Sequence, residues 1–208
     1  MNRRKTFQKR VITNTVLLVC GGQTEKWYFE NYKKSDAKIV ICCKCKNSVS
    51  SPTKVVDYAI ELKRKNPQKY LRVYAIFDKD DFIDFDDAIK KAQKNGIYPI
   101  FSNQSFELWF LQYFEITSSP IDRKNYGEKL NSYYRKYYEN RNIKYSKTQG
   151  TISQIQLVCS EKIEDAINNC KINFQQKNLS HRENKTKFSN LESISNVFSL
   201  VEYLEKLE

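Results

Sequence analysis

The stretch from Val73 to Asp81, which reads VYAIFDKDD, constrains the fold of this chain more than any other part of the sequence. Its apolar, β-branched and aromatic residues predict a buried parallel strand, and Asp78, Asp80 and Asp81 follow directly at the end of that strand. Because carboxylates this close repel one another, the first interpretation is a divalent cation beside them. Aspartate is also common in turns and at helix N-caps, so the same residues could merely end the strand and cap the next helix.

Length and charge narrow the class of protein. The 208 residues suffice for one sizeable core, alone or with a small appended lobe. The longest apolar runs are strand-sized and the first ten residues do not resemble a secretory signal, so we expect no membrane contact and a cytoplasmic location. The net charge of +12 favours a polyanionic partner such as nucleic acid. We interpret the basic residues between positions 2 and 10 as a flexible arm.

The cysteines do not form a metal or disulfide pattern. Cys42, Cys43 and Cys45 crowd one stretch, no C-x-x-C pair occurs, and the one histidine, His181, is remote in sequence. This spacing argues against a zinc site, and a catalytic Cys-His pair would lack an orienting group. We therefore expect buried free thiols and a histidine in a solvated loop.

Strand and helix patterns alternate up to residue 115, which predicts a mainly parallel sheet of four strands covered by helices on both faces. The expected strands are Thr15 to Cys20, Lys38 to Cys45, Leu71 to Phe77 and Ile97 to Phe101. The expected helices run from about Glu25 to Lys34 with Thr24 as N-cap, from Ser51-Pro52 to Asn66, from Asp84 or Asp86 to Asn95-Gly96, and through FELWFLQYF. The strand from Asn95 to Phe101 could be an edge strand that pairs between subunits of a homo-oligomer.

Right-handed crossovers place every loop that follows a parallel strand on one edge of the sheet. Glu25 follows the first strand, and Asp78 and Asp80 follow the third. We therefore expect these acidic residues to lie on the same edge, despite the distance between them in sequence.

The residues after 115 have a different composition, and we divide the chain into an α/β core with its basic arm, residues 1–115, and a helical extension packed on it, residues 116–208. Helical patterns cover about Glu128 to Glu139, Ile152 to Phe174 and Ile194 to Leu207, and the polar stretch QQKNLSHRENKTKFSN predicts an exposed loop.

The segment from Arg123 to Lys147 combines eight Lys or Arg with six tyrosines. Aromatic rings beside cations can stack on bases while the cations neutralise phosphates, so this segment is the candidate nucleic-acid-binding surface. Some of these tyrosines fall at i, i+4 on a helix, and one such pair could instead face the core. The basic candidates for this surface are Arg135, Lys136, Arg141, Lys144 and Lys147.

Three elements in order, LLVCGGQTEKWYFE, the strand with FDKDD, and SNQSFELWFLQYF, resemble the RloB-like family, and the ending LVEYL continues the likeness. This is a family of bacterial proteins associated with defence and restriction loci. The resemblance implies a Toprim-like fold, a metal-dependent nuclease that acts on DNA or RNA with Mg²⁺ or Mn²⁺, a role against phage by abortive infection, and other defence proteins as partners.

The resemblance assigns the site residues one by one. Asp78 and Asp80 match the Asp-x-Asp that binds the metal, and Glu25 matches the glutamate of a Thr-Glu pair as a further ligand or base. Glu107 matches a Phe-Glu element and is expected to be a ligand or to support one. The implied catalytic residues are therefore Glu25, Asp78, Asp80 and Glu107, of which the first three hold the metal.

The chain departs from the family pattern at three positions. Gly21 stands where a glutamate is usual, Gln104 replaces a proline, and Tyr113 replaces a histidine. A protein without the glutamate at position 21 could be a slowed nuclease, or a Toprim-like module that binds or senses nucleic acid without turnover. A phosphatase with a nucleophilic Asp-x-Asp and a dinucleotide-binding protein are weaker alternatives, because the first motif usually follows the first strand and Gly21-Gly22 is not a Gly-x-Gly-x-x-Gly loop.

Overall fold

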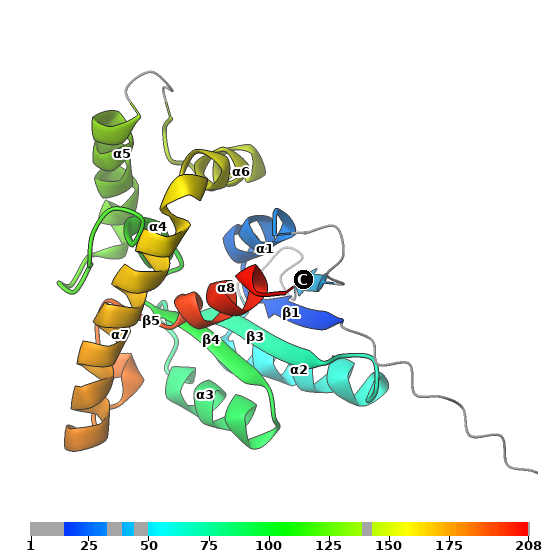
Figure 1. Cartoon of the computed structure of the whole chain (residues 1–208). Coiled ribbons are helices and arrows are strands. Elements are labelled where there is room, and N and C mark those ends of the chain that lie inside the picture. Colours follow the sequence, from blue (N-terminus) through cyan, green and yellow to red (C-terminus); the bar gives the residue numbers. More distant parts are fainter. Residues whose placement is uncertain (1–14, 33–38, 44–49, 139–142, 208) are drawn as a thin grey trace, which may run out of the picture.

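A five-stranded sheet organises the computed structural model, which describes residues 15–32, 39–43, 50–138 and 143–207 (Figure 1). The strands are β1 Val16–Cys20, β2 Ile39–Cys43, β3 Arg72–Asp78, β4 Tyr98–Asn103 and β5 Ile194–Ser195. Their order across the sheet is β2-β1-β3-β4-β5, with the first four parallel and β5 antiparallel to β4. The predicted α/β class and the mostly parallel sheet are confirmed. The prediction of four strands was wrong by one, because β5 begins where a helix was expected.

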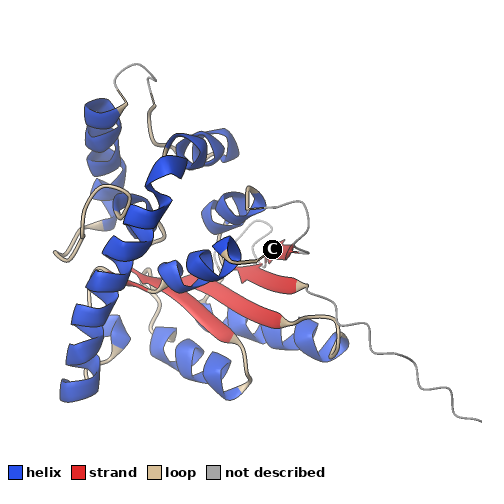
Figure 2. Cartoon of the chain, viewed as in Figure 1, coloured by secondary structure: helices blue, strands red, loops and turns tan. Residues whose placement is uncertain are grey.

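Eight α-helices surround this sheet in the described part of the chain (Figure 2). They are α1 Gln23–Glu30, α2 Pro52–Lys65, α3 Phe85–Lys94, α4 Glu107–Leu111, α5 Tyr126–Tyr137, α6 Gln149–Val158, α7 Ile163–Asn184 and α8 Val197–Glu205. Helices α1 and α8 lie over one face of the sheet, and α2 and α3 lie over the other (Figure 1). Helices α5 and α6 lie beyond the end of the sheet where α4 begins, and the long helix α7 runs past its β5 edge.

The strand side chains divide between two hydrophobic clusters, one on each face. Val16, Leu18 and Cys20 join the cluster that contains α1, α4 and α8, whereas Leu17 and Val19 join the cluster of α2 and α3. All five of these residues are fully buried. A strand covered on both faces needs apolar residues at every position, which explains the unbroken run VLLVC.

Three predictions about the ends of helices can be compared directly with the structure. Ser51 is the N-cap of α2 with Pro52 in its first turn, as predicted. Gly96 adopts a positive φ of 62° directly after α3, as expected for a residue that ends a helix. The prediction that Thr24 caps α1 was wrong, because α1 already begins at Gln23 with Gly22 as its N-cap.

The helical region after residue 115 differs from the prediction in two places. The expected helix from Ile152 to Phe174 is broken by a 3-10 turn, Ser160–Lys162, between α6 and α7. Helix α7 then continues to Asn184, through most of the stretch predicted to be a loop. A helix with most of its surface in solvent needs few apolar residues, so its sequence resembles that of a loop. His181 lies in this helix with its ring stacked on Phe188, not in a solvated loop.

The edge of β4 is covered within the chain. Beyond the short pairing with β5, the Asn196 side chain accepts a hydrogen bond of 2.7 Å from the Phe101 N–H and donates one of 2.9 Å to the Pro99 carbonyl. Strand β4 therefore lies between β3 and the β5 segment. The prediction of an edge strand available to a second subunit was wrong, because Asn196 occupies the backbone groups that such pairing would use.

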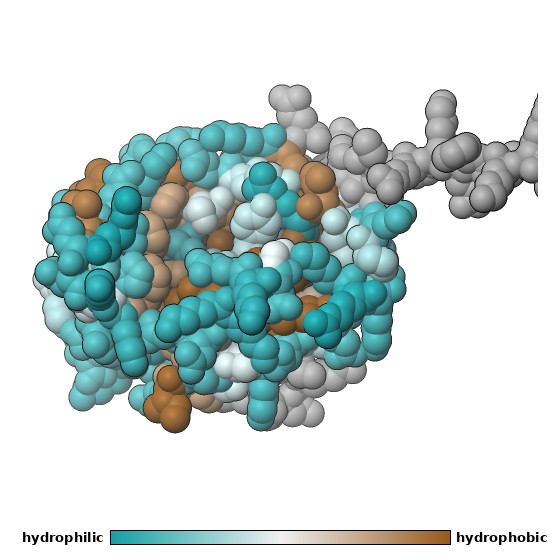
Figure 3. Space-filling model, turned by 90° about the horizontal axis from the view of Figure 1, so that it is seen from below, coloured by the Kyte–Doolittle hydropathy of each residue, from teal (hydrophilic) through white to brown (hydrophobic). Residues whose placement is uncertain are grey.

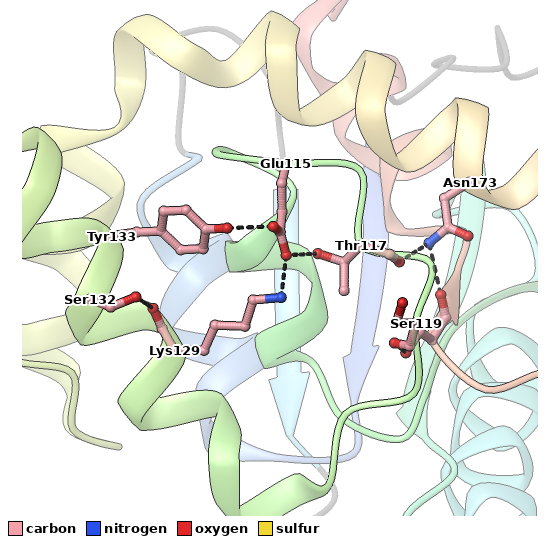
Figure 4. Close-up of polar contacts among 8 residues, drawn as sticks. Glu115, Thr117, Ser119, Lys129, Ser132, Tyr133 and Asn173 are labelled. Carbon is pink, nitrogen blue, oxygen red and sulfur yellow. Dashed lines mark hydrogen bonds and ion pairs between the residues drawn. The ribbon is translucent and has the colours of Figure 1, made fainter.

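A partly buried polar network joins the helical region to the core (Figure 4). Glu115 follows α4, and its carboxylate accepts hydrogen bonds from the hydroxyl groups of Tyr133 and Thr117. The same carboxylate forms an ion pair with Lys129. On the other side, the Asn173 amide of α7 donates to the carbonyls of Thr117 and Ser193. The connection after α4 is therefore bonded to both α5 and α7.

The surface seen from below is mostly hydrophilic, with hydrophobic side chains among the polar ones (Figure 3). No helix in the described ranges combines the length and the hydropathy needed to cross a membrane. Cys20, Cys159 and Cys170 carry buried free thiols, as predicted, whereas the free thiol of Cys42 is only partly buried. The expected basic arm at residues 2–10, Cys45 and Arg141 lie outside the described residues.

Candidate active site

Four carboxylates gather where the parallel strands end. Asp78 is the last residue of β3, Asp80 follows two positions later, Glu25 lies in the first turn of α1 after β1, and Glu107 opens α4 after β4. In each pair among the four, the charge of one carboxylate raises the pKa of the other. The structure therefore brings together all four residues that the sequence singled out, across 82 positions of the chain from Glu25 to Glu107.

Asp78 is the central member of this group. Burial, and then the charges of Glu25, Asp80 and Glu107, hold its pKa well above the usual value. The Asp78 Oδ2 atom accepts a hydrogen bond of 3.0 Å from the backbone N–H of Phe106, which precedes α4. This hydrogen bond fixes the direction of the carboxylate while the surrounding charges oppose its ionisation.

Glu25 is 4% exposed, and its position depends on the glycine three residues earlier. A Cβ atom at Gly22 would lie 2.5 Å from Glu25 Oε2, closer than real Cβ contacts allow. Gly22 has an extended backbone with φ of −131°, so the glycine is needed for space and not for its backbone freedom. Burial, together with the charges of Glu107 and Asp80, raises the pKa of Glu25 to about 7, although its own backbone N–H and Lys147 act in the opposite direction.

Asp80 lies in the turn after β3 with a positive φ of 43°, a conformation that aspartate tolerates better than most residues. Its backbone N–H donates to the Gln104 carbonyl at 3.0 Å, which holds the turn against the end of β4. The Asp80 Oδ1 atom lies 3.1 Å from a guanidinium nitrogen of Arg123. Burial raises the pKa of Asp80, and the charges of Arg123 and Lys147 only partly offset this effect.

Glu107 is 2% exposed and has the strongest partners of the four carboxylates. The Lys147 ammonium lies 2.6 Å from Glu107 Oε1, and the Tyr145 hydroxyl donates to the same oxygen. Burial raises the pKa of Glu107, but Lys147 and Tyr145 outweigh it, so the pKa lies below its usual value. Glu107 is therefore ionised and compensated, in contrast to Glu25 and Asp78.

The segment that carries Tyr145 and Lys147 is anchored before it reaches Glu107. The backbone N–H of Tyr145 donates to Asn131 Oδ1 at 2.6 Å, and its ring packs against Phe110 with centroids 6.2 Å apart. Tyr145 is thus held by α5 and α4 together, whereas the Lys147 side chain is 54% exposed. The cation at the end of this segment can move while the tyrosine stays in place.

The donor set suits a hard divalent cation, because Mg²⁺ and Mn²⁺ prefer carboxylate oxygens. Asp80 Oδ1 is buried and accepts no hydrogen bond from any residue that the structure describes, since its contact with Arg123 is an ion pair without hydrogen-bond geometry. Within the described ranges, no three His, Cys, Asp or Glu side chains converge in an arrangement ready to hold a metal ion. Two of the four carboxylates instead face Arg123 and Lys147. The residues fit a metal in their chemistry, and the present directions of Asp80 and Glu107 are set by cations of the protein.

Position 21 is crowded. The Gly21 N–H donates to the Ile76 carbonyl at 2.8 Å, and a Cβ at this position would lie 3.2 Å from that carbonyl oxygen and 3.3 Å from a Val55 methyl group. The loop after β1 therefore lies so close to the end of β3 that a side chain at position 21 would require its neighbours to shift. Among the described residues of the loop and helix that follow β1, Glu25 is the only acidic residue that lies in this site.

The predicted nucleic-acid-binding residues fall into two groups. Arg135 and Lys136 lie exposed at the end of α5, and Lys144 is exposed before the site. Lys147 instead pairs with Glu107. Of the six tyrosines, Tyr126 and Tyr134 are buried in the core, and Tyr137 is 44% exposed. Tyr133, Tyr138 and Tyr145 are partly buried against the same core, so most rings of this segment serve packing. Of the predicted i, i+4 pairs, Tyr134 and Tyr138 face the core, the first buried and the second partly buried.

Tyr113 lies away from the carboxylates. Its hydroxyl is 2.9 Å from the Tyr28 hydroxyl, and it lines a pocket of about 500 Å³ together with residues of α6 and α8 and the two residues that follow α1. None of the four carboxylates lines this pocket. The replacement of a histidine at position 113 therefore affects a packing site and not the acidic one. Gln104, by contrast, contacts the site through its carbonyl and the Asp80 N–H.

Arg123 and Tyr145 are the functional candidates that sequence reasoning missed. Arg123 opens a 3-10 turn whose N-cap Asp122 accepts a hydrogen bond from Lys124, and this turn directs the arginine towards Asp80. The only signal in the sequence was that both residues belong to the basic, tyrosine-rich segment. Their contacts with the acidic residues depend on how the helical region packs on the core.

One protein-family model matches nearly the whole of this chain. The family model described as RloB-like protein matches residues 16–204, which include all four carboxylates and both cations. None of the curated proteins and none of the solved structures matches the chain. Because the family model spans most of the sequence, the chain belongs to the RloB-like family.

Proposed function

We propose that this protein is a divalent-metal-dependent nuclease with a Toprim-like core, which acts on DNA or RNA in the bacterial cytoplasm as part of anti-phage defence. The observation that carries the proposal is the gathering of Glu25, Asp78, Asp80 and Glu107 at the ends of parallel strands, where burial and mutual repulsion raise the pKa of the first three. Such a cluster is costly without a function, and perturbed carboxylates of this kind are typical of sites that bind metal or transfer protons.

In the proposed site, Asp78 and Asp80 are the principal ligands of Mg²⁺ or Mn²⁺ and Glu25 is a further ligand or a base. When bound, the ion supplies Lewis acidity next to the phosphodiester. Phe106 orients Asp78 through its backbone N–H. A pKa of about 7 lets Glu25 accept a proton near neutral pH, which suits a group that activates an attacking nucleophile. Lys147 and Arg123 place positive charge beside the position where phosphate charge develops.

The charge of the chain supports a nucleic-acid substrate. The net charge is +12, and Arg135, Lys136 and Lys144 are exposed on the helical region next to the segment that reaches the site. Cations on this surface can neutralise phosphates along a strand whose backbone enters the carboxylate cluster. The interaction is then governed by phosphate contacts and weakens steeply with salt.

A second candidate function is favoured by one observation. Gly21 leaves no room for the usual glutamate without a shift of Ile76 or Val55. A protein of this kind could bind or sense nucleic acid, and work with other defence proteins, without cleaving its ligand.

The experiment that separates the two functions is a cleavage assay. We incubate the full chain with plasmid, single-stranded DNA and tRNA in Mg²⁺ or Mn²⁺, beside Asp78→Asn and Gly21→Glu. As a matched control we use Asp57→Asn, which removes a surface carboxylate paired with Lys91. Cleavage by the parent and by Asp57→Asn but not by Asp78→Asn supports the nuclease. Binding without cleavage by the parent, with cleavage gained in Gly21→Glu, supports the sensing module.

A further inference from the structure

Two basic side chains from the helical region already occupy the acidic site. Arg123 pairs with Asp80 at 3.1 Å, and Lys147 pairs with Glu107 at 2.6 Å. Both cations come from beyond residue 115, and both carboxylates come from the α/β core. The site therefore carries its own counter-charges.

The two members of each pair differ in their freedom to move. Asp80 and Glu107 are 14% and 3% exposed in their side chains, whereas Arg123 and Lys147 are 49% and 54% exposed. Arginine and lysine have long flexible stems, and ion pairs with such exposure are weak because water competes for the cation. If one partner leaves, it is the cation, which turns into solvent while the carboxylate stays on its strand end or helix.

A divalent ion would compete with Arg123 for the oxygens of Asp80, and it would repel Lys147, whose charge already acts on Glu25 and Asp80. An ion placed among Asp78, Asp80 and Glu25 adds two positive charges close to Arg123 and weakens its attraction to Asp80. The phosphate of a substrate on that ion would offer new anionic oxygens on the solvent side, where the displaced cations turn. The same residues can thus compensate the carboxylates before metal binding and the phosphate after it.

We propose that Arg123 and Lys147 are built-in counter-cations that hold Asp80 and Glu107 in the metal-free protein, yield to the divalent ion, and then bind the substrate phosphate. This inference rests on the proposed function. Tyr145 is the positioning residue of the exchange, because Asn131 and Phe110 keep its hydroxyl on Glu107 when Lys147 leaves.

The exchange predicts two effects of opposite sign for one substitution, which a structural ion pair would not give. We titrate Mn²⁺ into the full chain by calorimetry and measure binding of a labelled single-stranded oligonucleotide in Ca²⁺, for the parent, Lys147→Met and Arg123→Met. Each substitution removes a competitor, so the Mn²⁺ affinity rises by about 3- to 10-fold. Each substitution also removes a phosphate contact, so the affinity for the oligonucleotide falls by about 10-fold. The slope of log affinity against log salt concentration becomes less steep by about one unit.

The matched control is Lys171→Met. Lys171 of α7 pairs with a partly buried carboxylate, Glu202 of α8, at 3.9 Å, and both residues lie outside the segment from Arg123 to Lys147. We expect unchanged affinity for Mn²⁺ and for the oligonucleotide in this variant. Lys147→Arg, which keeps the charge, should retain parental behaviour in both assays.

The outcomes distinguish this inference from the proposed function. If the parent binds Mn²⁺ through Asp78 but Lys147→Met and Arg123→Met leave the Mn²⁺ affinity unchanged or lower it, the exchange is overturned and the nuclease proposal stands. If Mn²⁺ binds to Lys147→Met or Arg123→Met but not to the parent, the cations do not yield to the ion and the exchange is overturned. If neither the parent nor these variants bind Mn²⁺, both proposals are overturned.

Discussion

The Oδ2 atom of Asp78 accepts a hydrogen bond of 3.0 Å from the backbone N–H of Phe106, and this bond joins the end of β3 to the start of α4. The relationship separates two roles of Asp78. As a hydrogen-bond acceptor, the Asp78 carboxylate fixes the geometry of the strand ends. Its negative charge is disfavoured by burial and by three neighbouring carboxylates.

Replacement of Asp78 should therefore affect stability in a way that depends on the new side chain. Asp78→Asn keeps an acceptor for the Phe106 N–H and removes the charge, so we expect the free energy of unfolding in EDTA to rise by about 1–2 kcal/mol. Asp78→Ala leaves the N–H unpaired and should be less stable than Asp78→Asn by about 1–3 kcal/mol. Urea unfolding at pH 8 measures both values. Equal destabilisation by the two substitutions would show that the charge is not strained in the folded protein.

Gly22 should control the metal site through Glu25. A Cβ at Gly22 would meet Glu25 Oε2 at 2.5 Å, so Gly22→Ala displaces that carboxylate, and we expect Mn²⁺ affinity to fall by about 10-fold. Gly150→Ala is the control, because a Cβ there has no atom within 4 Å. In a Glu25→Ala background, Gly22→Ala should have no further effect on Mn²⁺ affinity. An equal loss in both backgrounds would mean that the methyl group acts elsewhere.

The raised pKa of Glu25 has a consequence for stability against pH. A carboxyl group whose pKa rises from 4.5 to about 7 on folding stabilises the folded state fully below pH 4.5, and this stabilisation is lost as the pH rises through 7. The change corresponds to on the order of 3 kcal/mol. We therefore expect the free energy of unfolding in EDTA to fall between pH 4.5 and 7. Glu25→Gln should flatten this decline, whereas Asp57→Asn, an exposed control, should not. A parental profile that rises over this range would contradict the assignment.

The acidic part of the site was predictable because residues that follow different parallel strands lie at the same edge of the sheet, even when they are far apart in the sequence. The patterns around β1 and β3 sufficed to place Glu25 and Asp78 together, since the position of a residue after a strand depends on local sequence alone. Arg123 was not predictable in the same way. Its contact with Asp80 spans 43 positions and depends on how the helical region docks, which no local pattern encodes.

Errors in the fold have similar physical causes. Strand β5 has two residues, which are too few to show a periodic pattern. Its pairing with Ser102 and Asn103 is a tertiary contact, which local sequence does not predict. Helix α7 extends through polar residues because its surface faces solvent, where composition does not distinguish a helix from a loop. No local pattern indicates that Gly22 provides space for a side chain three positions later, because this contact is seen only in the folded chain.

The central claim is that the carboxylates around Asp78 bind one divalent ion, and a calorimetric titration of Mn²⁺ into the full chain tests it most directly. At pH 8 the parent should bind Mn²⁺, and Asp78→Asn should lose this binding by about 100-fold while remaining folded, as judged by its urea unfolding curve. Asp57→Asn should bind as the parent does. A parent that binds no Mn²⁺, or an Asp78→Asn variant that binds it equally well, would contradict the account.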